Sequence, residues 1–230
     1  MRRYSMEQTE EIQSSRVREY FEKSAAAFDS IYSGQKNAFA RWLDHVLRKD
    51  MYERFRLTQE ECATDDIRSI LDVGTGSGRF CLPLADQKDR TVGIDFSAPM
   101  IELAREYANK LGVADKCDFR VSDFLDVDFQ EPFDAIMAIG LFDYIKAPEP
   151  FLEKMRLLTR RKVVATFPSL WTWRAPIRWI RLGLLGCPVY FYSKSRVQAL
   201  CAKADLNILR LDRVGKIFFL VAEPRSGGPQ

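Results

Sequence analysis

The strongest constraint on this chain is its segment 70–78, Ile-Leu-Asp-Val-Gly-Thr-Gly-Ser-Gly. Apolar residues run into a turn with a glycine at every second position, Gly74, Gly76 and Gly78, and a helix-like stretch follows. Glycine lets the backbone approach a ligand closely because it has no Cβ, and a helix that begins there would present unbonded N–H groups. The pattern predicts a strand, a turn and a helix that together bind a nucleotide-type cofactor.

Two acids refine this prediction. Asp95 ends a second apolar segment about 20 residues further on, where a carboxylate accepts hydrogen bonds from ribose hydroxyls in βαβ nucleotide folds. Asp72 precedes the turn, where it would repel a pyrophosphate and attract an ammonium group. Arg79 stands where a dinucleotide fingerprint would continue with glycine. These residues favour a cofactor with an ammonium group, and a nicotinamide-dependent oxidoreductase is the alternative.

This segment resembles the first motif of the class I S-adenosylmethionine-dependent methyltransferases, which reads acid-x-Gly-x-Gly-x-Gly. The resemblance continues at 97–100, 121–124 and 133–136, and it covers about residues 68–167. The stretches 83–85, 20–21 and 31–33 resemble the magnesium-protoporphyrin O-methyltransferases and neighbouring quinone-pathway enzymes. The resemblance implies an α/β fold with a doubly wound, seven-stranded, mostly parallel sheet, and S-adenosyl-L-methionine as the cofactor.

Hydrophobic periodicity and turn residues place the individual elements. We expect an N-terminal helical cap or lid at 1–66, a Rossmann-like domain at 67–223 with a Trp- and Arg-rich insertion at 169–192, and a loose tail at 224–230. The expected strands are 67–73, 91–95, 117–121, 135–139 and 162–167, and the expected helices include 79–85, 97–112 and 193–204. The resemblance implies that a final pair, 207–214 and 217–222, is an antiparallel hairpin.

In an open parallel sheet, ligands bind beyond the carboxyl ends of the strands, at the point where the strand order reverses. The resemblance implies roles there for residues contacting the methionine portion, the ribose, the adenine and the sulfonium. Asp72, Gly74, Thr75 and Gly76 would contact the methionine portion, and Asp95 would contact the ribose. Phe96, Met100, Asp123 and Phe124 would surround the adenine, and Ile139 with Gly140 would border the sulfonium. Tyr20, on an N-terminal helix expected at 10–34, is a further candidate for reaching the pocket. Any one of the acids would also suit a turn or helix cap.

The methyl acceptor is predicted from what the loop 140–144 contains. A sulfonium is already an activated leaving group, so the protein mainly aligns the reactants and excludes water. A hydroxyl acceptor would use a base, for which Asp143 and Tyr144 are the candidates, whereas a carboxylate acceptor needs none. The loop lacks the [Asp/Asn]-Pro-Pro-aromatic pattern of nucleic-acid amino methyltransferases. We therefore expect transfer to oxygen of a small molecule rather than to a nucleic acid.

Charge and composition bound the partners and the compartment. Residues 160–230 hold 13 lysines and arginines against three acids, although the whole chain is only +3. This is typical of a solvated basic face, and it would also suit an anionic acceptor or peripheral contact with an acidic membrane. No apolar run reaches a membrane span of about 18 residues. Five cysteines without a C-x-x-C pair and a single histidine, His45, predict a cytoplasmic protein without a metal site. A non-catalytic protein that binds S-adenosylmethionine is the other alternative.

Overall fold

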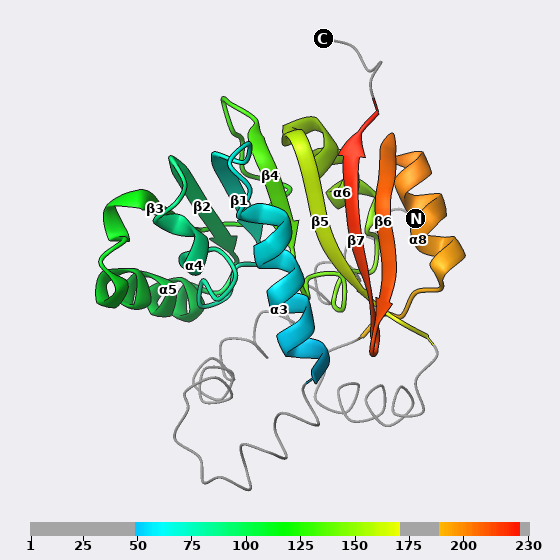
Figure 1. Ribbon diagram of the computed structural model, residues 1–230, viewed down its shortest axis with the longest axis horizontal. Coiled ribbons are helices and arrows are strands. Elements are labelled where there is room, and N and C mark those ends of the chain that lie inside the picture. The colour runs from blue at the N-terminus through cyan, green and yellow to red at the C-terminus, as the bar shows by residue number, and fades with distance from the viewer. Residues whose placement is uncertain (1–48, 171–188, 226–230) are drawn as a thin grey trace, which may run out of the picture.

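A seven-stranded sheet forms the centre of the computed structural model, which describes residues 49–170 and 189–225. The strands are ordered β3-β2-β1-β4-β5-β7-β6 across the sheet (Figure 1). They are β1 (Ser69–Val73), β2 (Arg90–Asp95), β3 (Cys117–Val121), β4 (Phe133–Ala138), β5 (Thr159–Pro168), β6 (Leu206–Val214) and β7 (Ile217–Pro224). The helices are α3 (Lys49–Cys62), α4 (Leu82–Ala85), α5 (Ala98–Leu111), η1 (Ala114–Lys116), α6 (Glu149–Leu158) and α8 (Lys194–Lys203).

The topology confirms the doubly wound prediction. Strands β3, β2, β1, β4 and β5 are parallel, whereas β7 is antiparallel to both β5 and β6. The chain winds outward from β1 in one direction through β2 and β3, and then returns to β4 on the other side of β1. The strand order therefore reverses between β1 and β4, which is where ligands bind in sheets of this kind.

Each face of the sheet buries a separate hydrophobic core. One core packs strand residues such as Leu71 and Ile136 against α6 and α8. The other packs the alternate residues, Ile70 and Met137 among them, against α3, α4 and α5. This alternation follows from the two-residue period of a strand, and β1 and β4 are buried along their whole length because both faces of the sheet are covered.

The segment after the glycine turn differs from the prediction. The sequence predicts a helix over 79–85, but α4 has only four residues and begins at Leu82. Gly78 has φ 79°, and its carbonyl accepts from the Leu82 amide at 2.9 Å, so residues 79–81 form a turn. Pro83 in the first turn of α4 cannot donate a backbone hydrogen bond. The helix of free N–H groups expected beside the cofactor is therefore absent from this segment.

The other predicted elements are close to those observed. Ser193 caps α8 by accepting from Arg196 N at 3.2 Å, and Gly112 ends α5 with φ 71°. Ser97 occupies the N-cap position of α5, but its hydroxyl makes no capping bond. Strand β4 lies two residues earlier at its start than predicted, and β5 is longer at both ends.

The elements at the two ends of the predicted domain agree in part with the prediction from the sequence. The antiparallel pair β6–β7 is confirmed, and β7 extends to Pro224, which pairs with Leu206 although the tail was predicted to begin there. Helix α3 lies in the predicted cap and contributes the buried Leu57 and Cys62 to the core that contains α4 and α5. The helix at 10–34, most of the insertion at 169–192 and residues 226–230 lie outside the described residues.

A buried carboxylate joins the amino ends of β1 and β4. Oδ2 of Asp134 accepts hydrogen bonds from the amides of Arg68 and Ser69, both at 2.9 Å, and from Ser69 Oγ at 3.0 Å. Burial acts to raise the pKa of Asp134, but these hydrogen bonds outweigh it and hold the pKa below its usual value. The two central strands are therefore fixed to each other at the end opposite the predicted site.

Replacing Asp134 with Ala should lower the free energy of unfolding by about 3 kcal/mol at pH 7, because two buried amides lose a charged acceptor. Since the folded-state pKa is depressed, this stabilisation is present above about pH 4 and disappears as the pH falls further. Urea denaturation at pH 7 and pH 3 measures both effects. Asp118→Ala, which removes an exposed partner of Arg120, should cost less than about 1 kcal/mol. Equal losses for the two variants would contradict this interpretation.

Candidate functional site

The glycine turn, residues 74–78, joins the carboxyl end of β1 to the residues before α4. Gly74, Gly76 and Gly78 all have positive φ, at 71°, 55° and 79°, a conformation that disfavours residues with a Cβ. The amides of Gly74 and Thr75 both donate to Ile94 O, at 2.8 and 2.9 Å. A Cβ placed on Gly76 would meet no atom of the described residues within 4 Å, so they leave open space beside that glycine. The turn is thus held rigidly against β2 and leaves room at Gly76.

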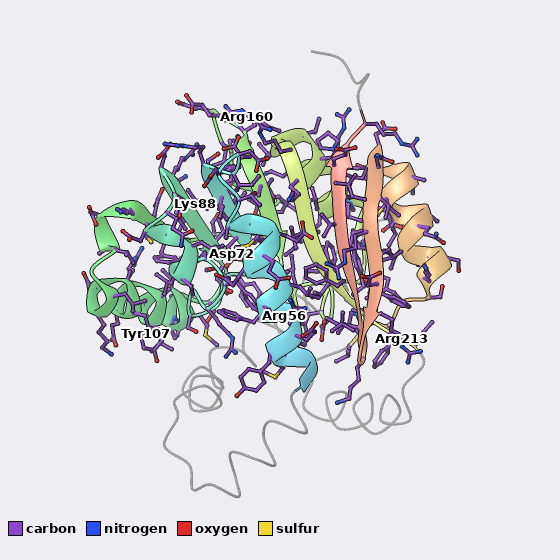
Figure 2. The ribbon with its side chains drawn as sticks, viewed as in Figure 1. Arg56, Asp72, Lys88, Tyr107, Arg160 and Arg213 are labelled. Atoms are coloured by element: carbon purple, nitrogen blue, oxygen red, sulfur yellow. The ribbon has the colours of Figure 1, made fainter. Side chains whose placement is uncertain are left out.

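Asp72 lies beneath this turn at the centre of the molecule (Figure 2) and is 1 % exposed. Its Oδ2 accepts from Thr75 Oγ1 at 2.9 Å, and Thr75 Oγ1 is in turn 3.4 Å from Cys81 Sγ. Burial raises the pKa of Asp72 to about 7, and the hydrogen bond from Thr75 opposes that rise only in part. Asp72 is therefore a carboxyl group that can change its charge near neutral pH.

Gly93 makes room for this arrangement from the neighbouring strand. It pairs with Asp72 in the register of β1 and β2. A Cβ at Gly93 would lie 2.6 Å from the ring of Phe119 and 2.9 Å from Thr75 Oγ1. Thr75, whose hydroxyl group bonds to Asp72, can therefore occupy its position only because residue 93 has no side chain.

Asp95 connects three loops at the carboxyl ends of β2 and β3. Its Oδ2 accepts from Gly76 N and its Oδ1 from Ser97 N, both at 2.9 Å. Its backbone carbonyl accepts from Ser122 N at 3.0 Å. Burial raises the pKa of Asp95, while the hydrogen bonds from the amides of Ser97 and Gly76 oppose that shift. Asp95 and the glycine turn, predicted from separate motifs, are thus in direct contact.

The residues predicted to contact the adenine have mixed surroundings. Phe96 is half-buried, and Met100 on α5 is 4 % exposed. Asp123 is half-buried and accepts from Leu125 N at 2.9 Å, as a turn residue does. Phe124 is buried in the core beside α6, with its ring 5.9 Å from that of Phe151. The four residues follow β2 and β3, but their contact with a cofactor stays a prediction.

The carboxyl end of β4 faces the glycine turn. Ile139 is buried, and Gly140 has φ 82° and donates its N–H to Thr166 Oγ1 on β5 at 2.8 Å. Leu141 packs on the turn, because a Cβ at Gly74 would lie 3.0 Å from its Cδ1. The structure therefore brings the ends of β1, β2 and β4 together, as the sequence predicted.

The two candidate bases follow in the same loop. Asp143 is 6 % exposed, and its backbone carbonyl accepts from Tyr190 N at 2.8 Å. Tyr144 is half-buried and donates its amide to Leu141 O at 3.0 Å. Their role as bases stays a prediction. Tyr20 lies outside the described residues.

Sequence reasoning missed several residues that shape this site: Cys81, Gly93, Leu141, Thr166 and Arg54 on α3, whose guanidinium lies near Gly140. Each of these residues shapes the site through a contact that the sequence does not reveal, either with a residue far away along the chain or within a turn. Only Gly93 carried a signal, because a glycine within an apolar strand indicates a close approach by other atoms.

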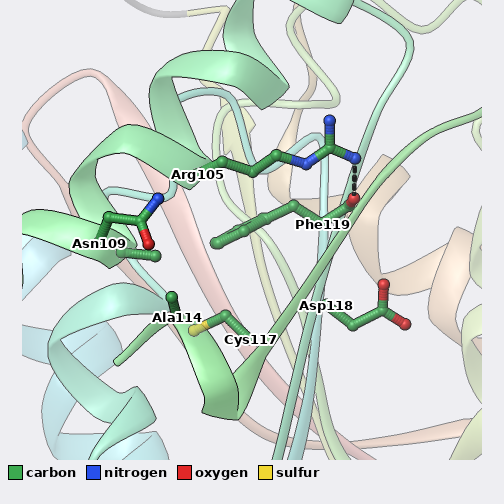
Figure 3. Close-up of a pocket in the computed structure, with 7 residues that line it drawn as sticks. Arg105, Asn109, Ala114, Cys117, Asp118 and Phe119 are labelled. Carbon is green, nitrogen blue, oxygen red and sulfur yellow. Dashed lines mark hydrogen bonds between the residues drawn. The ribbon is translucent and has the colours of Figure 1, made fainter. Parts of the chain in front are cut away.

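A separate hollow of about 500 Å³ lies away from these strand ends. Arg105 and Asn109 of α5, Cys117 and Phe119 of β3, and Ala114 contribute to its lining (Figure 3). Cys117 begins β3, whereas the candidate site lies where β3 ends. Because β3 is an edge strand, this hollow lies at the edge of the sheet. There Arg105 donates a hydrogen bond to Phe119 O at 2.7 Å.

The fold and the site together define the class of the protein. A doubly wound sheet with a glycine turn at its reversal point and an acid contacting that turn from the next strand is a nucleotide-cofactor-binding architecture. A family model described as a methyltransferase domain matches residues 65–176. This part of the chain is therefore a methyltransferase domain, and the chain resembles S-adenosylmethionine-dependent methyltransferases in sequence and in fold.

Individual relatives agree with this assignment. Phosphatidylethanolamine N-methyltransferase of Cereibacter sphaeroides is 33% identical over 93 residues, which are 40% of this chain and 45% of that protein. Ubiquinone biosynthesis O-methyltransferase of Rhodopseudomonas palustris is 31% identical over 105 residues, 44% of this chain and 41% of the relative. The matched part therefore spans less than half of either relative.

Among solved structures, magnesium protoporphyrin IX methyltransferase of Synechocystis with bound S-adenosylhomocysteine superimposes with a TM-score of 0.71. The alignment covers 93% of this chain and 100% of that one, at 17% identity. At this identity the likeness shows the fold alone. No helix in the described residues is both long and apolar enough to cross a membrane.

Affinity for S-adenosylhomocysteine should increase by roughly five- to tenfold between pH 6 and pH 7.5 if Asp72 receives the ammonium group. The reason is that a carboxyl group with a pKa of about 7 becomes ionised over this interval. Isothermal titration calorimetry across the interval measures the effect, and Asp72→Asn should bind more weakly with little pH dependence. An equally steep pH dependence in Asp72→Asn would contradict the assignment.

The same variant supplies an internal control on stability. Because burial raises the folded-state pKa of Asp72 above its unfolded value, the protein without ligand should lose stability as the pH rises from about 4 to about 7. Asp72→Asn should therefore be more stable than the parent at pH 8 while binding more weakly. Reduced stability together with reduced binding would instead indicate a damaged fold.

Proposed function

We propose that this chain transfers a methyl group from S-adenosylmethionine to an oxygen atom of a small-molecule acceptor. The observation that carries the proposal is the hydrogen bond between Asp95 and Gly76, which joins the predicted ribose acceptor to the glycine turn at the reversal point of the sheet. Relatives named for methyl transfer to nitrogen and to oxygen both match the chain. The choice of oxygen therefore rests on the residues of this site.

The residues present fit the cofactor. Open space adjoins Gly76 among the described residues, so a ligand can lie against the turn without displacing any of their side chains. Asp72, when ionised, offers a negative charge to the methionine ammonium group, directly or through water. Asp95 offers carboxylate oxygens to the ribose hydroxyls, and each oxygen has a second lone pair beyond the amide that it already accepts.

The chain itself supplies alignment and exclusion of water. When bound, S-adenosylmethionine provides a methyl group on a positively charged sulfur, and in-line attack forms the new bond to oxygen as the carbon–sulfur bond breaks. The buried Ile139 and Gly140, which is held by Thr166, follow the end of β4 and would border the acceptor. A carboxylate acceptor brings no proton to remove, whereas a hydroxyl acceptor would pass its proton to Asp143 or Tyr144.

Replacing Asp95 with Asn should weaken binding of S-adenosylhomocysteine by about 10- to 100-fold, because hydrogen bonds to a charged acceptor are lost. Calorimetry on the full chain measures this, with melting temperatures as a check on folding. Asp86→Asn, which alters an exposed carboxylate paired with Lys116, is the matched control and should bind like the parent. Tight binding of NAD⁺ and none of the methylated sulfur nucleoside would favour an oxidoreductase instead.

Methyl transfer and the atom methylated are tested together. Incubation with methyl-labelled S-adenosylmethionine and a panel of carboxylic acids, phenols and amines should label an acid or a phenol. Alkaline treatment releases the label from a methyl ester but not from an ether or a methylamine. Cofactor binding without transfer to any of these would favour a non-catalytic binding protein, and label only on amines would overturn the choice of oxygen.

A further inference from the structure

Arg54 lies on the buried side of α3. Leu57 and Thr58, three and four residues further along the helix, are 2 % and 0 % exposed, and residues at these spacings share a face. Thr58 Oγ1 donates to Arg54 O at 2.7 Å, which also fixes this turn of the helix. Arg56 differs from Arg54 in being mostly exposed. Helix α3 therefore directs one arginine toward the sheet and another toward solvent (Figure 2 labels Arg56).

The guanidinium of Arg54 reaches the carboxyl end of β4. A Cβ placed on Gly140 would lie 3.7 Å from Arg54 Nη1. The same construction at Gly76 finds no atom within 4 Å from the part of the chain that the structure describes. The cation is therefore located at the strand end predicted to border the acceptor, rather than at the turn predicted to hold the methionine portion.

This charge has no acidic partner within the described part of the chain. No hydrogen bond or ion pair joins its guanidinium to a described residue, and its Nε is buried without an acceptor. Arg56, by contrast, forms ion pairs with Glu53 and Glu60. The buried acids of the site, Asp72 and Asp95, also owe none of their pKa shifts to Arg54.

An unmatched buried donor on a permanent cation is unfavourable until an acceptor arrives. The guanidinium is a planar fork of N–H groups that matches a carboxylate in a bidentate manner. The residues that the structure describes place no carboxylate on this guanidinium, which leaves it open to a carboxylate carried by a ligand. Two sources are available at this site, the methyl acceptor and the methionine portion of the cofactor, and the position beside Gly140 favours the acceptor.

We propose that Arg54 binds a carboxylate of the methyl acceptor through its guanidinium at the carboxyl end of β4. This proposal rests on the proposed function and narrows it, because it assigns the substrate to the class of carboxylic acids. A carboxylate held here would either be the methylated group or would anchor an acceptor that is methylated at another oxygen. In both cases the anion compensates the charge of Arg54.

The test uses 1-naphthoate as the probe anion and 1-naphthamide as its uncharged counterpart. Each is titrated by calorimetry into the full chain saturated with S-adenosylhomocysteine. The parent should bind the naphthoate at least tenfold more tightly than the amide, and Arg54→Met should abolish this preference. Arg54→Lys, which keeps the charge without the fork, should retain part of it. Arg56→Met, which changes an exposed arginine about half a helical turn from Arg54, is the matched control and should retain all of it.

The outcomes separate this proposal from the proposed function. Failure of the parent to bind S-adenosylhomocysteine would overturn the proposed function itself. Normal cofactor binding with equal affinity for naphthoate and naphthamide would overturn only the role of Arg54, and this comparison needs no variant to fold. If Arg54→Met instead lowers the affinity for S-adenosylhomocysteine tenfold while leaving the preference for naphthoate intact, the guanidinium binds the carboxylate of the cofactor. The assignment of Arg54 to the acceptor is then wrong.

Discussion

The hydrogen bonds to the Asp95 carboxylate are the interactions on which the rest of the site depends. One oxygen holds Gly76 in the glycine turn, and the other holds Ser97 at the start of α5. A single side chain therefore sets the spacing between the loops that follow β1 and β2. Because carboxylate hydrogen bonds to amides are short and directional, this spacing is built into the fold before any ligand binds. Binding can then use a preformed site instead of ordering one.

The burial of Asp72 lowers the stability of the folded protein. A carboxyl group that is 1 % exposed and lacks a cationic partner in the described residues is stabilised mainly by Thr75, and burial raises its pKa to about 7. Stability alone would favour an uncharged residue there. The acid makes physical sense if a cationic ligand group compensates it, and we propose the converse for Arg54, whose Nε is buried without an acceptor among the described residues. Under our proposal, the charges of the two residues are compensated only when both ligands are bound.

The sequence predicted the sheet and the acids at its edge because those features are local. Strands β1 and β2 are mostly apolar, and Asp72 and Asp95 stand at or next to their carboxyl ends. The helix predicted over 79–85 begins only at Leu82, because Gly78 has a φ of 79° and residues 79–81 form a turn that the spacing of apolar residues does not reveal. Arg54 and Thr166 could not be found from the sequence, because their importance comes from lying near Gly140, which is far away along the chain. Tyr20 and the Trp- and Arg-rich stretch 171–188 lie outside the described residues, so those predictions stand as they were made.

A crystal structure of the full chain with S-adenosylhomocysteine is the most direct test of the cofactor site assigned here, because it shows where the nucleoside binds. The interactions around Asp95 predict that both ribose hydroxyls lie within hydrogen-bonding distance of its carboxylate, with the sulfur atom between Gly76 and Gly140. A nucleoside bound elsewhere, for example in the hollow lined by Arg105 and Cys117, with Asp95 still bonded only to its two amides, would contradict it.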